Sequence, residues 1–363
     1  MDTTTLEQRA RAEGTPVIDG EKATFVWRGR KPVSVAGDFL DWSGEPIPLK
    51  EVAPGLWTHT LKLPRDTYVE YAFQDAKGRR VRDPLNERLT SNGFGDFNHY
   101  FHMPGSQPTP LAQRQRGVPR GTVTRHLVET HELCVGRQRA VHLYAPPTSE
   151  PCPLVVVLDG ADYLKRARLP TLVDNLIAEG RIRPIALALV PNGGAARSVE
   201  YFCSEATLLF FLDQVLPLAR QELNLVDEKR FPGAHGVLGA SLGGLMSLFM
   251  GLREPNVFGH VLAQSGAFSV WNRDLGVFPL ARLAASPPLE VWMDCGHFEA
   301  LAEGNRRILP VLQASGHRAE YREYHGGHSY PAWRDDVWRG LEWLFAPLSR
   351  ISGTGDKRSG PPS

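Results

Sequence analysis

The sequence predicts two domains: a small β-sandwich, followed by an α/β domain built on a mostly parallel sheet with helices on both faces. Three observations support this. The chain has 363 residues, of which 42% are hydrophobic, enough for two domains and at least one large core. Residues 20–105 contain short alternating runs broken by turn residues. Residues 122–350 alternate strand-like and helix-like runs, the pattern of a parallel sheet.

The first domain is predicted from its alternating apolar runs, which are typical of antiparallel strands in a β-sandwich. Residues 1–19 form an extension before it. Residues 106–121 are rich in Pro, Gly, Gln and Arg and are predicted to be a linker. The tail, residues 351–363, is predicted to be disordered. The strand-like runs are ATFVW, PVSVAGDF, GLWTHTLKL and YVEYAFQ.

The α/β domain opens with two paired strands, TVTRHLVETHEL and RQRAVHLYAP, joined by a turn at Val135-Gly136. Continuous apolar runs then indicate buried parallel strands, and runs with helical spacing lie between them. The expected strands are PLVVVLDG, PIALALVPNGG, HGVLGAS, VFGHVLAQSGAF, PLEVWMDCG and AEYREYHGGH. The expected helices are LPTLVDNLIAEG, SEATLLFFLDQVLPLARQEL, LGGLMSLFMGLREP, residues 305–316 and DDVWRGLEWLFAPL.

Composition excludes several classes of protein. The chain carries 41 Lys and Arg against 40 Asp and Glu, so we expect no nucleic-acid or membrane-surface partner. The N-terminus has no apolar segment typical of a signal peptide, and no run approaches the roughly 18 apolar residues of a membrane span. We therefore expect a cytoplasmic protein with reduced cysteines. Cys295-Gly-His297 is too tightly spaced for metal binding, so neither a metal nor another cofactor is expected.

The stretch GVLGASLGGL places Ser241 between a short strand and a helix. Gly239-x-Ser241-x-Gly243 in that context is the nucleophile-elbow pattern, in which a tight turn lifts the serine hydroxyl above the sheet edge. The backbone N–H of Leu242, at the start of the helix, would point at the carbonyl oxygen under attack. A second such donor should follow the strand PLVVVLDG, where the N–H of Ala161 is the best candidate.

A serine nucleophile needs a base, and in this architecture an acid and then a histidine follow it in the chain. His328 lies on the loop after the last predicted strand, where catalytic groups gather. His317 and His325 are the other histidines late enough in the chain. For the acid we favour Glu299, on the loop after PLEVWMDCG. The alternatives are Asp294, still on the strand, and Glu303, which starts the next helix.

The motifs LVVVLDGADYL, GASLGGL, CGHFEALAEGNR and GGHSYPAW resemble those of the esterase-D-like branch of the α/β-hydrolases over nearly all of residues 122–347. The segments GDFLDW, GLWTHTLKLP, YVEYAFQDAKG and DPLN resemble the early-set immunoglobulin-like domain of enterochelin esterases and glycogen-active enzymes. Together they resemble the enterochelin esterase family. The resemblance implies an α/β-hydrolase fold preceded by an Ig-like β-sandwich.

The same resemblance assigns roles to residues. It implies that Glu299, three residues after a glycine, is the acid, and that His328 of the Gly-Gly-His motif is the base. It also implies substrate contacts by Tyr330, Trp333 and Arg197. Arg197 has an equally weighted structural alternative, an ion pair with Glu200 or with a carboxylate at the sheet edge.

The expected function is hydrolysis of the ester bonds of a ferric catecholate siderophore through an acyl-serine intermediate, with the small-molecule ester as its partner. One alternative is a carbohydrate feruloyl or acetyl esterase on the same fold. A second is a binding protein with an inert elbow. The identity of the siderophore, its need for bound iron and the oligomeric state are left open.

Overall fold

The computed structural model describes residues 2–93, 95–283 and 287–347, and they form two compact units. The first unit contains Met1–Pro108 together with two segments from late in the chain, Cys295–Ala302 and Glu323–Ala332. The second unit holds the remaining described residues. The expectation for the tail, 351–363, lies outside the described residues.

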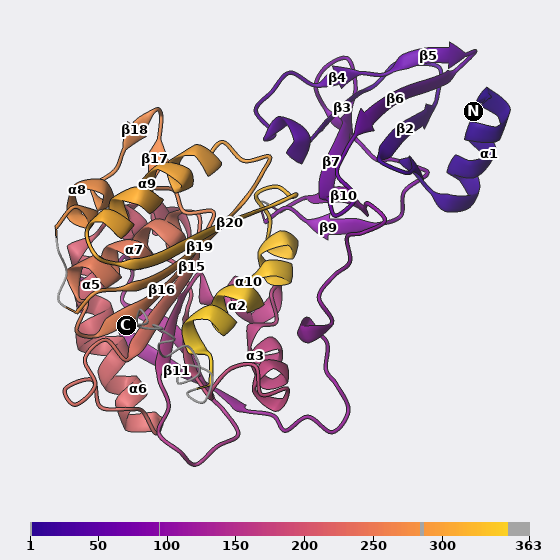
Figure 1. Cartoon of the computed structure of the whole chain (residues 1–363). Coiled ribbons are helices and arrows are strands. Elements are labelled where there is room, and N and C mark those ends of the chain that lie inside the picture. The colour runs from indigo at the N-terminus through magenta and orange to yellow at the C-terminus, as the bar shows by residue number, and fades with distance from the viewer. Residues whose placement is uncertain (1, 94, 284–286, 348–363) are drawn as a thin grey trace, which may run out of the picture. The chain divides into compact units, whose positions relative to one another are not determined.

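The first unit is built from two antiparallel sheets, coloured indigo to purple in Figure 1. One sheet has the order β1-β2-β6-β5 and the other β4-β3-β7-β10-β9, with β8 paired to β7. A helix, α1 (Thr3–Glu13), precedes them and is capped by the side chain of Asp2. The strands are β1 (Val17–Asp19), β2 (Lys22–Arg28), β3 (Ser34–Gly37), β4 (Ile47–Pro48), β5 (Lys50–Ala53), β6 (Leu56–Lys62), β7 (Tyr68–Gln74), β8 (Arg80–Val81), β9 (Leu89–Ser91) and β10 (Phe97–His102).

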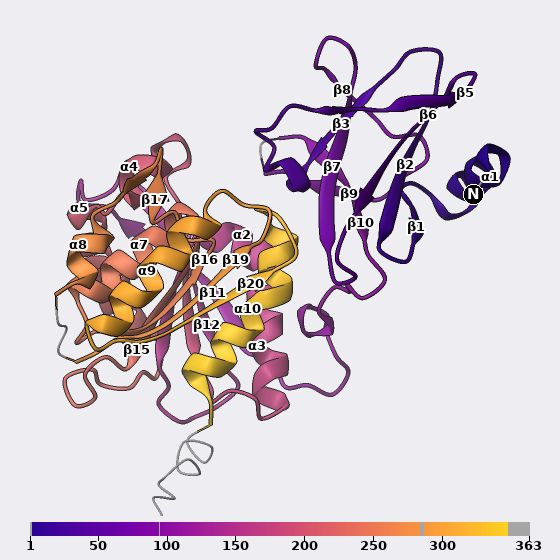
Figure 2. The same ribbon diagram turned by 45° about the horizontal axis from the view of Figure 1, so that its top comes forward.

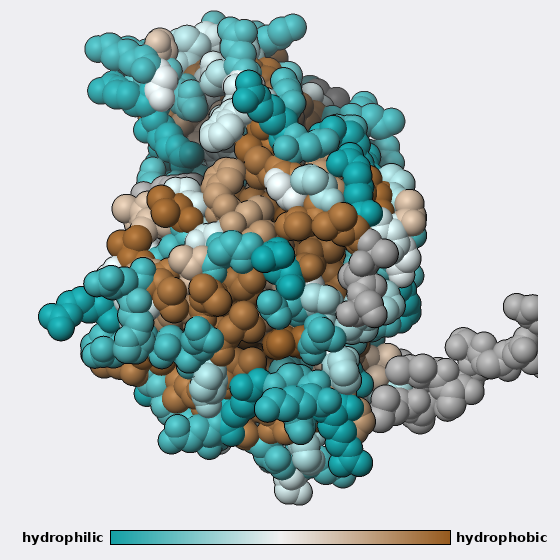
Figure 3. Space-filling view, turned by 90° about the vertical axis from the view of Figure 1, so that its left-hand side faces the viewer, coloured by the Kyte–Doolittle hydropathy of each residue, from teal (hydrophilic) through white to brown (hydrophobic). Residues whose placement is uncertain are grey.

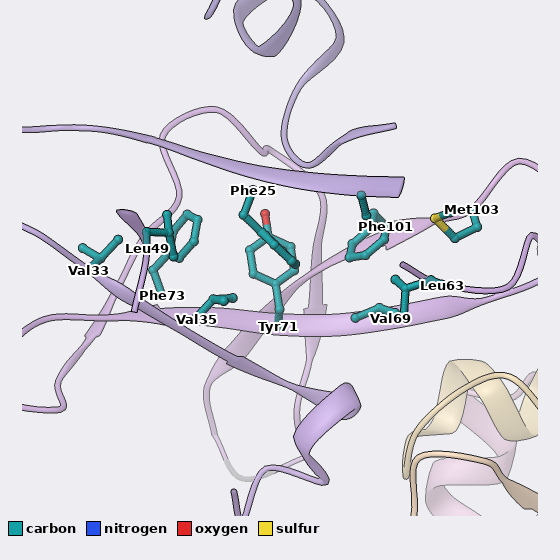
Figure 4. Packing of buried hydrophobic residues seen from close by; sticks show 11 residues of the cluster. Phe25, Val33, Val35, Leu49, Leu63, Val69, Tyr71, Phe73, Phe101 and Met103 are labelled. Atoms are coloured by element: carbon teal, nitrogen blue, oxygen red, sulfur yellow. The ribbon is translucent and has the colours of Figure 1, made fainter. Parts of the chain in front are cut away.

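One hydrophobic core is shared by these two sheets (Figure 4). Phe25 of β2 is fully buried at its centre, with its ring centroid 4.9 Å from that of Tyr71 on β7 and 5.9 Å from that of Phe101 on β10. Edge-on ring contacts of this kind stabilise beyond the buried area alone. Alternate residues of β2 (Ala23 and Phe25) and of β7 (Val69, Tyr71 and Phe73) point into this core, as a sandwich requires.

The sheet of the second unit has eight strands in the order β11-β12-β14-β13-β15-β16-β19-β20. Pairing is antiparallel from β11 through β12 to β14 and parallel from β14 to β19. The strands are β11 (Thr122–Glu129), β12 (Gln138–Ala145), β13 (Leu154–Leu158), β14 (Ala186–Val190), β15 (His235–Ala240), β16 (Phe258–Gln264), β19 (Glu290–Gly296) and β20 (Arg318–Tyr324). The mostly parallel sheet predicted from the apolar runs is confirmed.

Helices cover both faces of this sheet, with α2, α3 and α10 on one side and α7, α8 and α9 on the other (Figures 1 and 2). The short hairpin β17 (Ser269–Val270) and β18 (Arg273–Asp274) follows β16. The helices are α2 (Gly160–Lys165), α3 (Leu169–Ala178), α4 (Arg197–Tyr201), α5 (Glu205–Phe210), α6 (Leu216–Glu222), α7 (Leu242–Arg253), α8 (Val277–Ala281), α9 (Ala302–Ala314) and α10 (Tyr330–Phe345).

The long helix predicted over residues 204–223 is interrupted. A π-helical turn, Phe211–Val215, separates α5 from α6. Pro217 is the second residue of α6, and its ring nitrogen cannot donate the backbone hydrogen bond that a continuous α-helix needs. Within the described ranges no single helix is long and apolar enough to cross a membrane, and one bent pair, Gly194–Tyr201 with Glu205–Glu222, passes by length and composition alone.

We predict that Phe25→Ala lowers the free energy of unfolding of the first unit by about 3–5 kcal/mol, because it leaves a cavity at the centre of the shared core. Phe97→Ala is the matched control: Phe97 is 58% exposed, so its loss should cost less than about 1 kcal/mol. Urea unfolding followed by circular dichroism measures both, and equal losses would contradict the assignment of this core.

Candidate active site

Ser241 lies at the turn between β15 and α7, at the carboxyl end of a central strand. Its backbone has φ 61° and ψ −123°, a conformation that non-glycine residues adopt only under strain. Three backbone hydrogen bonds hold it there: its N–H donates to Gln264 (2.9 Å), and its carbonyl accepts from Leu245 (3.1 Å) and Ala267 (3.0 Å). The side chain is half-buried, so the hydroxyl stands on a rigid turn within reach of solvent.

The glycines around Ser241 are required by close packing. A Cβ on Gly239 would lie 2.5 Å from the carbonyl oxygen of Gly243, and one on Gly244 would lie 3.0 Å from the Cα of Gly266. No side chain could occupy Gly239 without moving the helix. The structure therefore has the tight strand–turn–helix geometry that the Gly-x-Ser-x-Gly pattern predicts.

Leu242 is the first residue of α7, so its N–H has no acceptor four residues earlier within the helix. Ala161 is the second residue of α2, on the turn after β13. Gly160 lets this turn approach β14, because a Cβ there would lie 2.2 Å from the backbone of Leu189. Both predicted oxyanion donors thus lie where strands β15 and β13 end and helices begin.

Arg197 forms an ion pair with Asp159, a carboxylate at the end of β13. Its Nε and terminal nitrogen donate to the two carboxylate oxygens at 2.8 Å and 2.7 Å, and the same terminal nitrogen reaches the carbonyl of Ala240 at 3.3 Å. The Asp159 side chain is 2% exposed and the Arg197 side chain 28% exposed. The fork geometry suits a carboxylate, so Arg197 ties the turn before Ala161 to the strand before Ser241.

Glu200, the other partner considered for Arg197, pairs instead with Arg139 of β12. The two side chains lie 2.7 Å apart and are both nearly buried. Glu200 also accepts from the N–H groups of Gly193 (3.0 Å) and Val135 (3.1 Å). These contacts fix the loops at positions 135 and 193 and leave Arg197 to Asp159.

Glu299 and His328 meet in the first unit, where the loops after β19 and β20 come together. Nδ1 of His328 lies 2.5 Å from Oε2 of Glu299, and the other oxygen of Glu299 accepts from the N–H of Gly296 at 2.8 Å. The Glu299 side chain is 1% exposed, whereas that of His328 is 34% exposed. A buried carboxylate held in this way fixes one face of an imidazole whose remainder stays accessible.

The alternative residues have other partners. Asp294 is fully buried on β19 and accepts from the side chains of Gln264 (3.2 Å) and Trp292 (3.1 Å). Glu303 lies in the first turn of α9. His317 accepts from the N–H of Leu289 at 3.1 Å, before β19 begins, and His325 pairs with Asp66 at 2.8 Å.

Tyr330 and Trp333 lie at the start of α10 and are largely buried, at 9% and 5% exposure. The indole N–H of Trp333 donates to the hydroxyl of Ser265 at 2.9 Å, and its carbonyl accepts from Gln264 at 3.1 Å. Because Gln264 also accepts the backbone N–H of Ser241 through its carbonyl, Trp333 supports the strand end beside the elbow.

The second unit also exposes a stacked aromatic pair. Trp271, 85% exposed at the tip of the β17–β18 hairpin, lies parallel to Phe202 with ring centroids 6.5 Å apart. Figure 3 shows apolar residues gathered on the face of the molecule that lies on the left of Figure 1, the side of α5, α6 and α8. Exposed apolar groups of this kind often bind ligands or partners.

Strand order places the three candidate catalytic residues after strands of one sheet. Ser241 follows β15, Glu299 follows β19, and His328 follows β20. The N–H of Arg318 donates to the carbonyl of Leu289, just before β19, and the N–H of His297 donates to the carbonyl of Tyr324 at the end of β20. From the first bond to the second, the residue numbers rise along both strands, so β19 and β20 are parallel. The carboxyl ends of β15, β19 and β20 therefore lie at the same edge of the sheet.

This combination of a mixed eight-stranded sheet, a strained serine elbow and a buried Glu–His pair defines the chain as an α/β esterase in class. The family described as "Putative esterase" matches residues 133–344, more than half of the chain. The chain therefore belongs to that family, and the family resemblance expected from its motifs is confirmed.

Individual relatives with similar sequences or structures are also esterases. The chain is 30% identical over 291 residues to an iron(III) enterobactin esterase of Dickeya dadantii, covering 73% of this chain but only 65% of that enzyme's length. It is 25% identical to an iron(III) salmochelin esterase of Escherichia coli O6:H1, covering 91% and 90% of the two chains. The crystal structure of a ferric enterobactin esterase from Salmonella typhimurium has a TM-score of 0.79 at 21% identity, covering 94% and 99%, and shows the same fold.

Sequence reasoning did not single out Asp159. The sequence does contain a pattern that points to this residue, because an Asp-Gly pair directly after a buried strand indicates a turn at the sheet edge. The backbone of Asp159 adopts φ 52°, and its N–H donates to the hydroxyl of Tyr201 at 3.1 Å. This residue thus connects the turn before Ala161 to α4.

We predict that Arg197→Met lowers the free energy of unfolding by about 2 kcal/mol, because Asp159 is left as a buried carboxylate without its fork partner. Arg166→Met is the control, since the Arg166–Asp162 pair is a surface pair one helical turn apart and should contribute less than about 0.5 kcal/mol. Thermal and urea unfolding measure the free energy of unfolding of both variants. Similar small losses in the two would contradict the role given to Arg197.

Proposed function

We propose that this chain is a serine carboxyl-ester hydrolase in which Ser241 is the nucleophile, His328 the base and Glu299 the orienting acid. The observation that carries the proposal is the hydrogen bond that Nδ1 of His328 donates to the buried carboxylate of Glu299, because that arrangement selects the imidazole tautomer a serine needs. The order Ser, Glu, His along the chain and the strained elbow at Ser241 support it.

In the proposed reaction, the hydroxyl oxygen of Ser241 attacks the ester carbonyl while Nε2 of His328 takes its proton. The carbonyl oxygen becomes an oxyanion that accepts hydrogen bonds from the N–H groups of Leu242 and Ala161. The intermediate collapses, His328 returns the proton to the departing alcohol, and an acyl-serine remains. Water then attacks the acyl carbon, again giving its proton to His328, and the carboxylic acid leaves as Ser241 is restored.

We propose that the substrate is an ester of a ferric catecholate siderophore of the enterochelin type, with iron as part of the substrate. The similarity to enterobactin and salmochelin esterases supports this more strongly than it supports the alternative, a carbohydrate feruloyl or acetyl esterase. The exposed pair Trp271 and Phe202 offers flat apolar faces that suit aromatic acyl groups. The proposal includes a cytoplasmic location and an Ig-like sandwich as the front domain.

The residues predicted to contact the substrate differ in how exposed their side chains are. The side chain of Arg197 is 28% exposed while it pairs with Asp159, and we propose that it presents positive charge to an anionic siderophore. Tyr330 and Trp333 are too buried for extensive stacking on a substrate ring. We propose that these two aromatic residues pack the start of α10 in place. Tyr330 lies only two positions after His328.

We predict that Ser241→Ala lowers kcat by about a million-fold and that Glu299→Gln lowers it by about ten-thousand-fold. Asp294→Asn, which removes one acceptor oxygen inside β19, should lower the free energy of unfolding and leave kcat per folded molecule nearly unchanged. Hydrolysis of p-nitrophenyl acetate, with circular dichroism as the folding control, tests all three. Full activity in Ser241→Ala would exclude Ser241 as the nucleophile. Failure of a fluorophosphonate to label Ser241 would favour a non-catalytic binding protein.

We predict that iron(III) enterobactin is hydrolysed with a kcat/KM at least about a hundred-fold above that for a feruloyl-arabinose ester, because specificity is a difference in transition-state binding. Product release followed by chromatography gives both rates under one set of conditions. The reverse preference would support the carbohydrate esterase. Comparing the ferric and iron-free forms of enterobactin shows whether iron must be bound.

A further inference from the structure

The two loops that carry Glu299 and His328 are attached to the β-sandwich of the first unit. Both loops belong to the same compact unit as the sandwich, although they lie far later in the chain, in Cys295–Ala302 and Glu323–Ala332. If Glu299 and His328 are catalytic, as proposed above, then the sandwich holds part of the catalytic machinery. The contacts that do so involve the turn 38–42, the start of β7 and the core of the sandwich.

The loop with Glu299 is held by Asp41. This residue ends the short 3₁₀ helix η1 (Asp38–Leu40) with φ 49°, and its carboxylate accepts from the N–H of Ala300 at 3.1 Å. Ala300 directly follows Glu299. On the other side of Glu299, the ring of Phe298 packs against the hydrophobic core of the sandwich. The acid is therefore bracketed by two attachments to the same domain.

The loop with His328 is held by the start of β7 and by Asp38. The N–H of Tyr68 donates to the carbonyl of His325 at 3.1 Å, and Asp66 pairs with the His325 ring at 2.8 Å. Gly327, directly before His328, lies against the side chain of Asp38. A Cβ on Gly327 would lie 2.3 Å from the carboxyl carbon of Asp38, so only glycine fits there.

Asp38 is itself fixed by its surroundings. Its two carboxylate oxygens accept from the N–H of Glu70 (2.7 Å) and from the indole N–H of Trp42 (2.8 Å). The residue is 2% exposed, and burial, followed by the nearby charge of Glu70, raises the pKa of the Asp38 carboxyl well above its usual range. A side chain held this firmly is a rigid stop for the backbone at Gly327.

We propose that the turn 38–42 of the β-sandwich positions the acid–base pair, with Asp41 setting the loop of Glu299 and Asp38 setting the loop of His328. Asp38 and Asp41 are positioning residues, because they act through the loops. The Gly326-Gly327 pair gives the histidine loop wide conformational freedom, and fixing it in advance lowers the entropy lost on reaching the reactive geometry. The sandwich is thus required for hydrolysis of any ester, including one too small to touch it.

The test compares two changes at Asp41 in the full chain, with p-nitrophenyl acetate as the substrate. Asp41→Ala removes the acceptor for Ala300, and we expect kcat to fall about tenfold with KM changed less than about twofold. Asp41→Asn keeps an oxygen that can accept the same N–H, and we expect it to recover most of kcat. Asp75→Ala is the control and should leave kcat unchanged, since among the described residues the N–H groups that donate to the Asp75 side chain lie in its own hairpin, 74–80.

A second variant approaches the same contact from the loop side. Gly327→Ala places a methyl group against Asp38, so kcat should again fall by about tenfold or more, and the melting temperature measured alongside reports the stability lost to the clash. Wild-type kcat per folded molecule in both Asp41→Ala and Gly327→Ala, measured with circular dichroism as the folding control, would overturn the proposal. So would equal losses in Asp41→Ala and Asp41→Asn.

His328→Ala separates this proposal from the one on which it rests. If His328→Ala abolishes hydrolysis while Asp41→Ala does not affect it, the catalytic assignment stands and the positioning role is wrong. If His328→Ala is fully active, the catalytic assignment itself fails.

Discussion

The chemistry proposed for this protein depends on one hydrogen bond, the contact between Oε2 of Glu299 and Nδ1 of His328 at 2.5 Å. It joins two loops that follow different strands, and it joins a buried carboxylate to an accessible ring. A carboxylate in that position fixes which imidazole nitrogen carries a proton and stabilises the imidazolium as it forms. Without it, neither the orientation nor the tautomer of the His328 ring would be defined.

The serine end of the proposed site is stabilised in a different way. The strain of Ser241, with φ 61°, is offset by backbone hydrogen bonds to three separate segments and by glycine contacts that no larger residue permits. The ion pair between Arg197 and Asp159 adds a charged link between the turns after β13 and β15. Rigid turns of this kind keep oxyanion donors in place before a substrate arrives.

The β-sandwich of the first unit also bears on the proposed acid–base pair. Its core receives Phe298, and its turn 38–42 contacts both loops of the acid–base pair. The boundary between domains drawn from the sequence at residues 106–121 describes the chain, whereas the compact unit also includes Cys295–Ala302 and Glu323–Ala332.

The sequence by itself determined the features that are local. Strand and helix periods gave the mostly parallel sheet, and the glycines around Ser241 gave the elbow, because a tight turn restricts which residues can stand beside it. The position of Glu299 and His328 after successive strands also followed from chain order. Tertiary structure alone decided that Arg197 pairs with Asp159 and not Glu200, that Pro217 follows a π-helical turn, and that Asp38 and Asp41 hold the two loops. These contacts join residues tens to hundreds of positions apart, or depend on packing around one turn, and no periodicity along the chain records which distant side chains will meet.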